Sequence, residues 1–203
     1  MHEYTIQGHD RKKFYYCLTF LSGFLSQSLA IWLSQLANLT NIVNVSLIAP
    51  SGLAIFGLLF LLFDNFLWKF SLLYRCGLIR IPNLNGQYNG FMTSAKKIGE
   101  IPVKVSIYQS YSKIRIRLET QSKLSYSYSI MASFETVDPN SFRFNYEYFS
   151  TYTPEQGELQ THYGVTRLRL ESTNNRFDGE QQGSYYTDRE RNSYGKIFIK
   201  KCK

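Results

Sequence analysis

Charge is missing from a long part of this sequence: the 50 consecutive residues Phe14–Phe63 contain no Asp, Glu, Lys, Arg or His. All 38 charged residues therefore lie in the other 153 positions, close to the 25% that is usual for a soluble domain. The mean hydropathy of −0.25 averages over these two unlike parts. The division excludes a single soluble globule. It also excludes a polytopic transporter, because only about a quarter of the chain is apolar enough to lie in lipid.

Residues that build catalytic or metal sites are also scarce. Cys17, Cys76 and Cys202 are the only cysteines, and they are too widely spaced for a zinc site made of Cys pairs. His162 is the only histidine outside the N-terminal tail. Glycine-rich phosphate loops, the G-x-S-x-G motif and the H-E-x-x-H motif are absent from the sequence. We therefore expect no catalytic residues, no metal and no cofactor, and we do not expect an enzyme.

The uncharged run is long enough for two membrane-spanning helices, since about 20 residues of helix cross the hydrocarbon core. It predicts helices over Phe14–Leu36 and Val45–Trp68, joined by the polar turn Ala37–Asn44. Basic residues flank both ends of the run and the turn carries no charge, which predicts that both termini lie in the cytoplasm. The chain then divides into an N-terminal tail (1–13), a two-helix transmembrane hairpin (14–68), a juxtamembrane linker (69–82) and a cytoplasmic domain (83–203).

The first predicted helix carries two glutamines, Gln27 and Gln35, among small residues. Small residues and amide side chains are typical of contacts between helices inside a membrane. Two interpretations are open. The glutamines pack against the second helix of the same chain, or they join helices of different subunits in a homo-oligomer.

Residues 83–203 alternate apolar and polar side chains with a period of two, which is typical of β-strands. Eight such segments are separated by turn-forming residues, and no stretch has the pattern of a long amphipathic helix. Antiparallel strands joined by short turns form a sandwich or an up-and-down barrel, and closure of the barrel removes exposed edges. We predict a membrane α-hairpin of two TM helices followed by an all-β domain, an eight-stranded up-and-down antiparallel β-barrel.

The predicted inner face of this domain is rich in tyrosine. An aromatic core explains its phenylalanines, but each buried phenol needs a hydrogen-bond partner, so inward tyrosines favour a wet or ligand-filled interior. Aromatic rings also stack on nucleobases, at about 1–3 kcal/mol per base. Arg189 alternates in step with Tyr185 and Thr187, so it is predicted to point inward. There it either stacks on Tyr88, the aromatic residue of the first predicted strand, or binds an anionic ligand. The residues assigned to the ligand are Tyr88, Tyr126, Tyr128, Tyr146, His162, Thr187 and Arg189.

Four arginines alternate with apolar residues and are expected to point outward from the strands. Such a row is a solvated face, a contact with anionic membrane lipid or a contact with a neighbouring barrel. The four are Arg115, Arg117, Arg167 and Arg169.

The layout of the whole chain resembles a known family. A charge-poor hairpin is followed by Leu-Asn-Gly-Gln-Tyr-Asn-Gly at 84–90, and the chain closes with Tyr-Tyr-Thr-Asp-Arg at 185–189 and Gly-Lys-Ile at 195–197. This arrangement is similar to the two-transmembrane, β-strand-rich effectors of bacterial cyclic-oligonucleotide-based antiphage signalling, the SMODS-associated type. Lipocalin-like barrels share the general form of the opening motif, usually with Trp where this chain has Tyr88.

The resemblance implies a mechanism and a set of partners. A cyclic-nucleotide synthase makes a cyclic dinucleotide, which binds the cytoplasmic β-barrel. Binding promotes oligomerisation of the TM hairpins, and the bacterial inner membrane is disrupted, so that the infected cell dies before phage are released. No nucleic acid polymer is expected as a partner.

Two alternatives predict a different interior of the β-domain. A membrane-tethered carrier for a lipid or another apolar ligand, with a lipocalin-like barrel, predicts an apolar barrel mouth. A structural membrane protein whose barrel only docks other proteins predicts a filled interior without a pocket.

Overall fold

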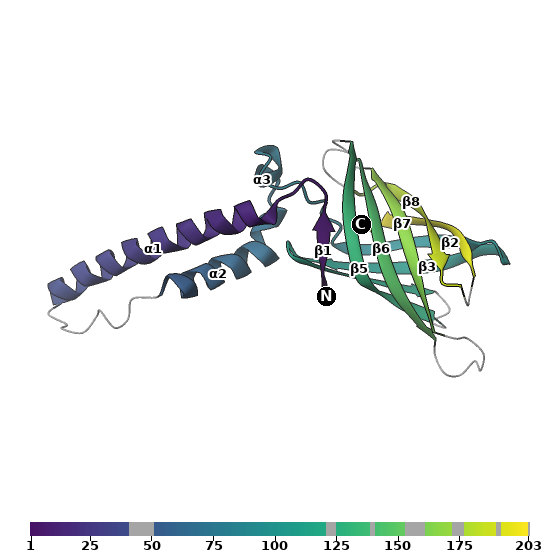
Figure 1. Cartoon of the computed structure of the whole chain (residues 1–203), viewed down its shortest axis with the longest axis horizontal. Coiled ribbons are helices and arrows are strands. Elements are labelled where there is room, and N and C mark those ends of the chain that lie inside the picture. Colours follow the sequence, from purple (N-terminus) through teal and green to yellow (C-terminus); the bar gives the residue numbers. More distant parts are fainter. Residues whose placement is uncertain are drawn as a thin grey trace. The chain divides into compact units, whose positions relative to one another are not determined.

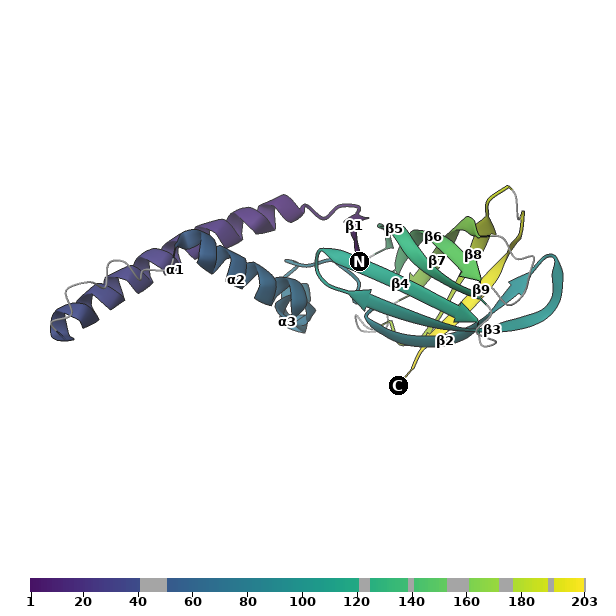
Figure 2. The same cartoon turned by 90° about the horizontal axis from the view of Figure 1, so that it is seen from below.

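The computed structural model of the chain describes residues 1–40, 51–120, 125–138, 141–152, 161–171, 177–189 and 192–202. The chain forms two compact units (Figures 1 and 2). The helical unit comprises His9–Ile79, and the sheet unit comprises Met1–Gly8 together with Arg80–Lys203.

The helical unit contains two long apolar helices, α1 and α2, that pack against each other (Figure 1). The Phe14 ring lies 3.9 Å from the Phe63 ring, measured between centroids, whereas Ser26 lies beside Gly52. The start of α1 therefore meets the end of α2, as in an antiparallel hairpin. The elements of the unit are α1 (Arg11–Thr40), α2 (Gly52–Asn65), the short 3-10 helix η2 (Leu67–Lys69) and α3 (Ser71–Arg75).

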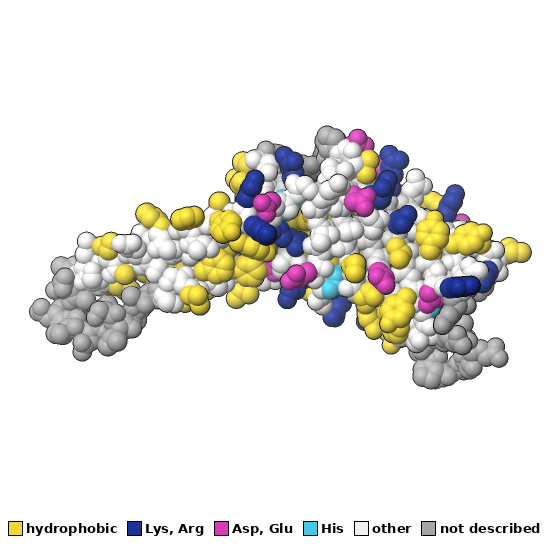
Figure 3. All heavy atoms as spheres, in the orientation of Figure 1, with side chains coloured by type: hydrophobic (Ala, Val, Ile, Leu, Met, Phe, Trp, Pro, Cys, Tyr) yellow, Lys and Arg dark blue, Asp and Glu magenta, His cyan; other side chains and the backbone are white. Residues whose placement is uncertain are grey.

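Two segments are long and apolar enough to cross a membrane by length and composition, Arg11–Leu36 and Gly52–Lys69. Only 11% of each is buried inside the structure, which does not fit the core helices of a soluble domain. Figure 3 shows hydrophobic side chains along most of both helices on the face drawn, without charged ones between them. An exposed apolar surface of this length suggests a membrane protein.

The helix boundaries differ in part from the predicted ones. The first helix starts at Arg11, so the basic residues assigned to the tail form its first turn. The second begins at Gly52, where the Ser51 hydroxyl accepts a hydrogen bond from the Ala54 backbone N–H at 3.2 Å. Residues 37–40 of the predicted turn instead continue α1, which ends at Thr40. The rest of the predicted turn (41–44) and the first residues of the predicted second helix (45–50) lie outside the described residues.

The sheet unit contains nine strands in one sheet. They are β1 (His2–Ile6), β2 (Gly86–Ser94), β3 (Lys97–Gln109), β4 (Lys113–Thr120), β5 (Ser125–Asp138), β6 (Ser141–Tyr152), β7 (His162–Glu171), β8 (Glu180–Thr187) and β9 (Tyr194–Lys201). Each of β2–β9 pairs antiparallel with the next strand, and β9 pairs back with β2. The predicted succession of antiparallel strands is therefore confirmed.

The ninth strand, β1, was not predicted, and it changes how the sheet closes. The strand order is β1-β4-β3-β2-β9-β8-β7-β6-β5, with β1 also paired to β5. Thus β1 lies between the start of β4 (His2 opposite Ile114) and the middle of β5 (Tyr4 opposite Ala132). Among the described residues, direct β4–β5 pairs involve three residues of β4, Arg117 to Glu119. What the chain forms is a closed nine-strand sheet, and a ring of eight strands is not confirmed.

A β-bulge in β5 reverses which side chains face the interior. The β5–β6 register shifts between Ser129 and Met131, where one extra residue is accommodated. Before the bulge Ser127 and Ser129 are buried, and after it Ala132 and Phe134 are buried. Because an extra residue inverts the parity of everything beyond it, alternation carried backwards from Phe134 assigns the wrong face to the first half of β5.

The interior of the sheet unit holds a large apolar core. Inward side chains of six strands are almost completely buried, and they stack in layers as expected for a closed sheet. They include Val105, Ile107, Ile114, Ile116, Phe134, Phe144, Leu168, Leu170, Ile197 and Ile199.

Candidate functional site

The strand register aligns the inward side chains of β5–β8 into rows, and three of these rows are polar. Each row follows the paired residues from one strand to the next. The first contains Ser127, Ser150 and His162; the second Ser129, Tyr148, Gly164 and Thr187; the third Ala132, Tyr146, Thr166 and Tyr185. We call these three the polar rows.

The next row along the same strands is apolar. It contains Phe134, Phe144, Leu168 and Gly183. The interior therefore changes from polar, where β5 begins and β6 ends, to apolar further along these strands. Ligand sites combine apolar walls with a few polar groups that fix orientation, so the polar rows are the candidate ligand site of the sheet unit.

Aromatic rings connect the polar and apolar rows along β6. The Phe144 ring lies 5.6 Å from that of Tyr146, and the Tyr146 ring lies 6.3 Å from that of Tyr148. Tyr148 in turn meets His162 edge to face at 6.2 Å. Rings at these separations attract each other, so the series is a continuous aromatic wall.

Gly164 on β7 leaves room for the end of the Tyr148 side chain. A Cβ atom at Gly164 would overlap Cζ and the hydroxyl of Tyr148, which is paired with it across β6 and β7. Any larger residue at this position would push the phenol away from the sheet. The glycine therefore positions one of the rings that face the interior.

The buried phenols stay neutral at physiological pH. Burial raises the pKa of Tyr146 to about 12, and a hydrogen bond with the Thr166 side chain partly opposes the rise. Burial also raises the pKa of Tyr88, with a smaller contribution from the negative charge of Asp178. Both phenols therefore remain hydrogen-bond donors as well as acceptors.

The raised pKa of Tyr146 predicts how stability depends on pH. An unfolded tyrosine ionises near pH 10, so its contribution is fully present below that pH and is lost as the pH rises to about 12. Tyr146→Phe should therefore lose less stability than wild type between pH 9 and pH 11.5. Melting temperatures of both proteins over this range test the prediction, which fails if the two curves are parallel.

Four of the seven predicted ligand residues face the interior. Tyr88, Tyr146 and His162 are buried, and Thr187 is half-buried. Thr187 is also engaged in a turn, because its hydroxyl donates to the Ser193 carbonyl oxygen at 3.0 Å and accepts from the Ser193 N–H at 2.8 Å. The structure brings Tyr146, His162 and Thr187 together in the polar rows.

Tyr88 has a different environment from the other three. Its hydroxyl donates to the Leu84 carbonyl oxygen at 2.8 Å, and its ring lies 6.0 Å from Nζ of Lys201. The cation beside Tyr88 is therefore Lys201 of β9, and the stack of Arg189 on Tyr88, one of the two interpretations left open for Arg189, is not found. Arg189 follows the end of β8 and is exposed, so its predicted inward orientation is wrong.

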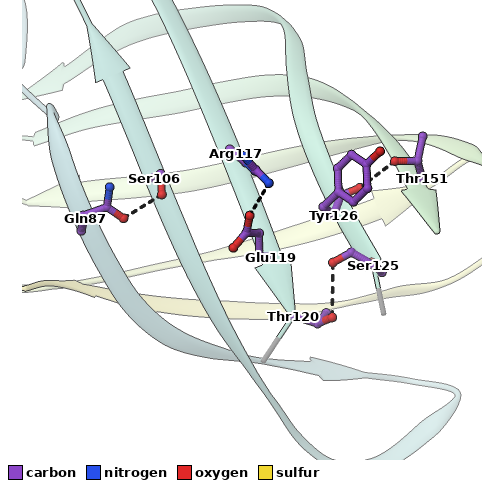
Figure 4. Close-up of polar contacts among 8 residues, drawn as sticks. All are labelled: Gln87, Ser106, Arg117, Glu119, Thr120, Ser125, Tyr126 and Thr151. Carbon is purple, nitrogen blue, oxygen red and sulfur yellow. Dashed lines mark hydrogen bonds and ion pairs between the residues drawn. The ribbon is translucent and has the colours of Figure 1, made fainter. Parts of the chain in front are cut away.

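Tyr126 and Tyr128 lie on the outer face of β5, contrary to the prediction. They are 39% and 41% exposed, and the bulge explains the reversal. The Tyr126 ring lies 5.9 Å from the Arg117 guanidinium carbon, and Figure 4 shows both side chains on neighbouring strands. The Tyr128 ring packs edge to face on Phe149 at 5.7 Å.

The four alternating arginines are exposed as predicted. Two of them have acidic neighbours on the same strand. Arg117 pairs with Glu119 at 2.6 Å, and Arg169 pairs with Glu171 at 3.0 Å. Part of this row is therefore a charge-paired solvated face.

Several members of the polar rows are not among the seven predicted ligand residues. The parity of β6, β7 and β8 carries a signal for Tyr148, Ser150, Thr166 and Tyr185, which share the inward face with Tyr146 and His162. Ser127 and Ser129 carried no such signal, because they precede the bulge. The small residues of β5 thus replace the two tyrosines that were expected inside.

The comparison with known families identifies this sheet. A protein-family model described as "Cap15, cyclic dinucleotide receptor domain" matches residues 79–201, more than half of the chain. The chain belongs to the Cap15 family. The Cap15 match includes all of β2–β9 and leaves out β1, α1 and α2. No match is found among curated proteins.

Membership of the Cap15 family confirms the resemblance inferred from the layout of the chain. The matched segment is a cyclic dinucleotide receptor domain, and it follows two helices that are candidates to span a membrane. Together these findings support an effector of antiphage cyclic-nucleotide signalling.

Proposed function

We propose that a cyclic dinucleotide binds inside the closed sheet at the polar rows and that its binding opens or disrupts a membrane through the helical unit. The observation that carries the proposal is the receptor-domain match over the strands that form the polar rows. The protein acts as a receptor and not as an enzyme. Strands β2–β9 act as an eight-stranded barrel, with β1 inserted between β4 and β5.

The chemistry of the polar rows fits a nucleotide ligand. The rings of Tyr146, Tyr148 and Tyr185 offer faces on which nucleobases stack. The hydroxyls of Ser127 and Ser150 offer donors to phosphate or ribose oxygens, and His162 adds an imidazole beside them. A carrier for an apolar ligand would need an apolar lining here instead.

The helical unit supplies the output. Gln27 and Gln35 are exposed on α1, whereas Ser22 and Ser26 of the same helix face α2. In hydrocarbon an amide side chain gains stability from a polar partner. Exposure of both glutamines favours contacts between subunits over contacts within the hairpin. Oligomers held in this way disrupt the inner membrane and kill the infected cell.

The topology follows from the flanking charges. Basic residues occur at 11–13 before the apolar part of α1 and at Lys69, Arg75 and Arg80 after α2. The positive-inside rule then predicts that both chain ends and the receptor domain lie in the cytoplasm. There the domain meets the product of the partner synthase.

Dye release from vesicles tests the proposed function. The full chain is inserted into phosphatidylethanolamine–phosphatidylglycerol vesicles and treated with 3′,3′-linked cyclic dinucleotides carrying every combination of the four RNA bases. At least one should release the dye, and the corresponding linear dinucleotides should not. No release by any of them from vesicles that contain the inserted protein would contradict the proposal.

The two outward tyrosines provide a sharp prediction about the ligand. The double variant Tyr126→Ala, Tyr128→Ala should bind the cyclic dinucleotide within about twofold of wild type, because both rings lie outside the sheet. Tyr148→Ala should weaken binding about 10–100-fold, as expected for the loss of one stacked base. Isothermal titration of the full-length proteins measures both. Equal losses in the two variants would contradict the assignment of inner and outer faces.

A further inference from the structure

Two segments connect the sheet unit to the helical unit, and both are anchored in the interior of the sheet. Residues 1–8 contain β1 and continue into α1, and residues 80–85 continue from α3 into β2. Tyr4 of the first segment and Ile81 and Leu84 of the second are almost completely buried. These two segments are the covalent connections through which a change in the sheet can reach the helices.

One buried side chain, Gln109 at the end of β3, binds both segments at once. Its Nε2 donates to the Pro82 carbonyl oxygen at 3.0 Å and to the Tyr4 hydroxyl at 3.3 Å. Its Oε1 accepts from the Leu84 N–H at 2.8 Å. Gln109 is 5% exposed, so these hydrogen bonds form away from water, where an unmade bond is costly.

The Tyr4 hydroxyl extends the same network to the β3–β4 turn. It donates to the carbonyl oxygens of Ser110 and Tyr111 at 3.0 and 2.9 Å. Asn85 adds a further link, since its Oδ1 accepts from the Gln109 N–H at 3.3 Å. We call Gln109 with its partners Tyr4, Pro82 and Leu84 the Gln109 clasp.

The aromatic wall of the polar rows reaches this clasp. Phe134 stacks on Phe144 at 4.4 Å, and Tyr4 meets Phe134 edge to face at 5.5 Å. Rings therefore follow one another from His162 through Tyr148 and Tyr146 to Tyr4. A second route is polar: Ser129 of the polar rows contacts Nε2 of His2 at 2.7 Å, and β1 lies beside β5 (Figure 1).

The linker segment has its own contact with the interior. The Tyr88 hydroxyl donates to the Leu84 carbonyl oxygen, and the Leu84 N–H is held by Gln109. Both segments thus touch an inward aromatic ring on one side and the clasp on the other. Because Gln109 holds both segments, a ligand that displaces Phe134 and Tyr4 shifts the two segments together.

We infer that the Gln109 clasp couples occupancy of the polar rows to the helices, with Gln109 and Tyr4 acting as positioning residues that do not touch the ligand. The inference rests on the proposed function. A ligand shifts an equilibrium only by its difference in affinity for the two states, so a protein without the coupling binds at least as tightly but no longer responds.

The test compares Gln109→Met with Gln87→Met in the full chain in vesicles. Methionine keeps the length of the side chain and removes the carboxamide. Gln87 is the matched control, because it lies on the outer face of the neighbouring strand β2 and accepts a hydrogen bond from the Ser106 hydroxyl at 2.7 Å (Figure 4). Tyr4→Phe is a second variant that keeps the ring on Phe134 and removes the hydroxyl.

Gln109→Met and Tyr4→Phe should reduce dye release by cyclic dinucleotide at least about tenfold. Their Kd should be equal to or tighter than that of wild type, and Gln87→Met should behave as wild type. Unchanged dye release in both clasp variants, or parallel losses of binding and dye release, would overturn the inference. If the wild-type protein neither binds the cyclic dinucleotide nor releases dye, that result contradicts the proposed function itself, and the comparison of the clasp variants does not apply.

Discussion

Ser150→Phe is expected to abolish cyclic dinucleotide binding, with a loss in affinity of at least about 100-fold. Ser150 is buried on β6 and paired with Ser127 on one side and His162 on the other, so all three side chains belong to the first polar row. A phenyl ring at this position would fill the part of the interior that the proposed function assigns to a nucleobase. Loss of two stacked bases at about 1–3 kcal/mol each accounts for the size of the effect.

The adjacent residue provides the control for this blocking experiment. Thr151 points to the outer face of β6, where its hydroxyl donates to the Tyr126 carbonyl oxygen (Figure 4). Thr151→Phe adds the same ring to the same strand but leaves the interior unchanged. Melting temperatures of both variants show whether each is folded. Wild-type affinity in a folded Ser150→Phe protein would exclude the polar rows as the ligand site.

The second large effect is expected in the membrane. Gln27→Leu combined with Gln35→Leu should reduce dye release, and toxicity in cells that express the synthase, at least about tenfold, with ligand affinity unchanged. The reason is that polar contacts between membrane helices contribute about 0.6–2 kcal/mol each, and an oligomer uses them once per subunit. Both glutamines are exposed on α1, so the hairpin itself should be retained.

Phe20→Leu is the matched control for the glutamines. Phe20 is exposed on the same helix, and the change is from one apolar residue to another. It should leave both dye release and toxicity at the wild-type level. Full toxicity of the double glutamine variant would show that these two residues do not contribute to assembly.

Much of the fold follows from the sequence pattern alone. Fifty uncharged residues define the helical hairpin, because no soluble core requires them. Alternation identifies β2–β9 and gives the correct inner face for β6 and β7, because apolar and polar residues alternate over Phe142–Tyr148 and Arg167–Leu170 and no bulge interrupts either strand. His162 and Tyr146 were predicted to face inward on that basis, and they do.

Two features broke the pattern, and each has a physical cause. The bulge at Ile130 and Met131 inverts β5, because one unpaired residue shifts every side chain before it to the other face. β1 has only five residues and no turn partner in the sequence, and it is stabilised by strands more than 100 residues away. Such pairing depends on tertiary contacts that a local pattern does not contain.

The interior cation was misplaced for a related reason. Side chains alternate between the two faces only within a strand. β8 ends at Thr187, two residues before Arg189, so alternation does not predict where Arg189 points. Lys201 lies at the end of a paired strand, and the register brings it opposite Tyr88. Whether Arg189 or Lys201 lies beside Tyr88 depends on where β8 and β9 end, and the ends of elements are hard to predict from a sequence.

Direct titration of the full-length protein in detergent micelles with the panel of 3′,3′-linked cyclic dinucleotides tests the central claim. The account predicts one site per chain, a Kd of about 1 μM or tighter for at least one of them, and loss of that binding in Ser150→Phe but not in Thr151→Phe. Absence of binding by the folded wild-type protein, for every combination of bases, would contradict it.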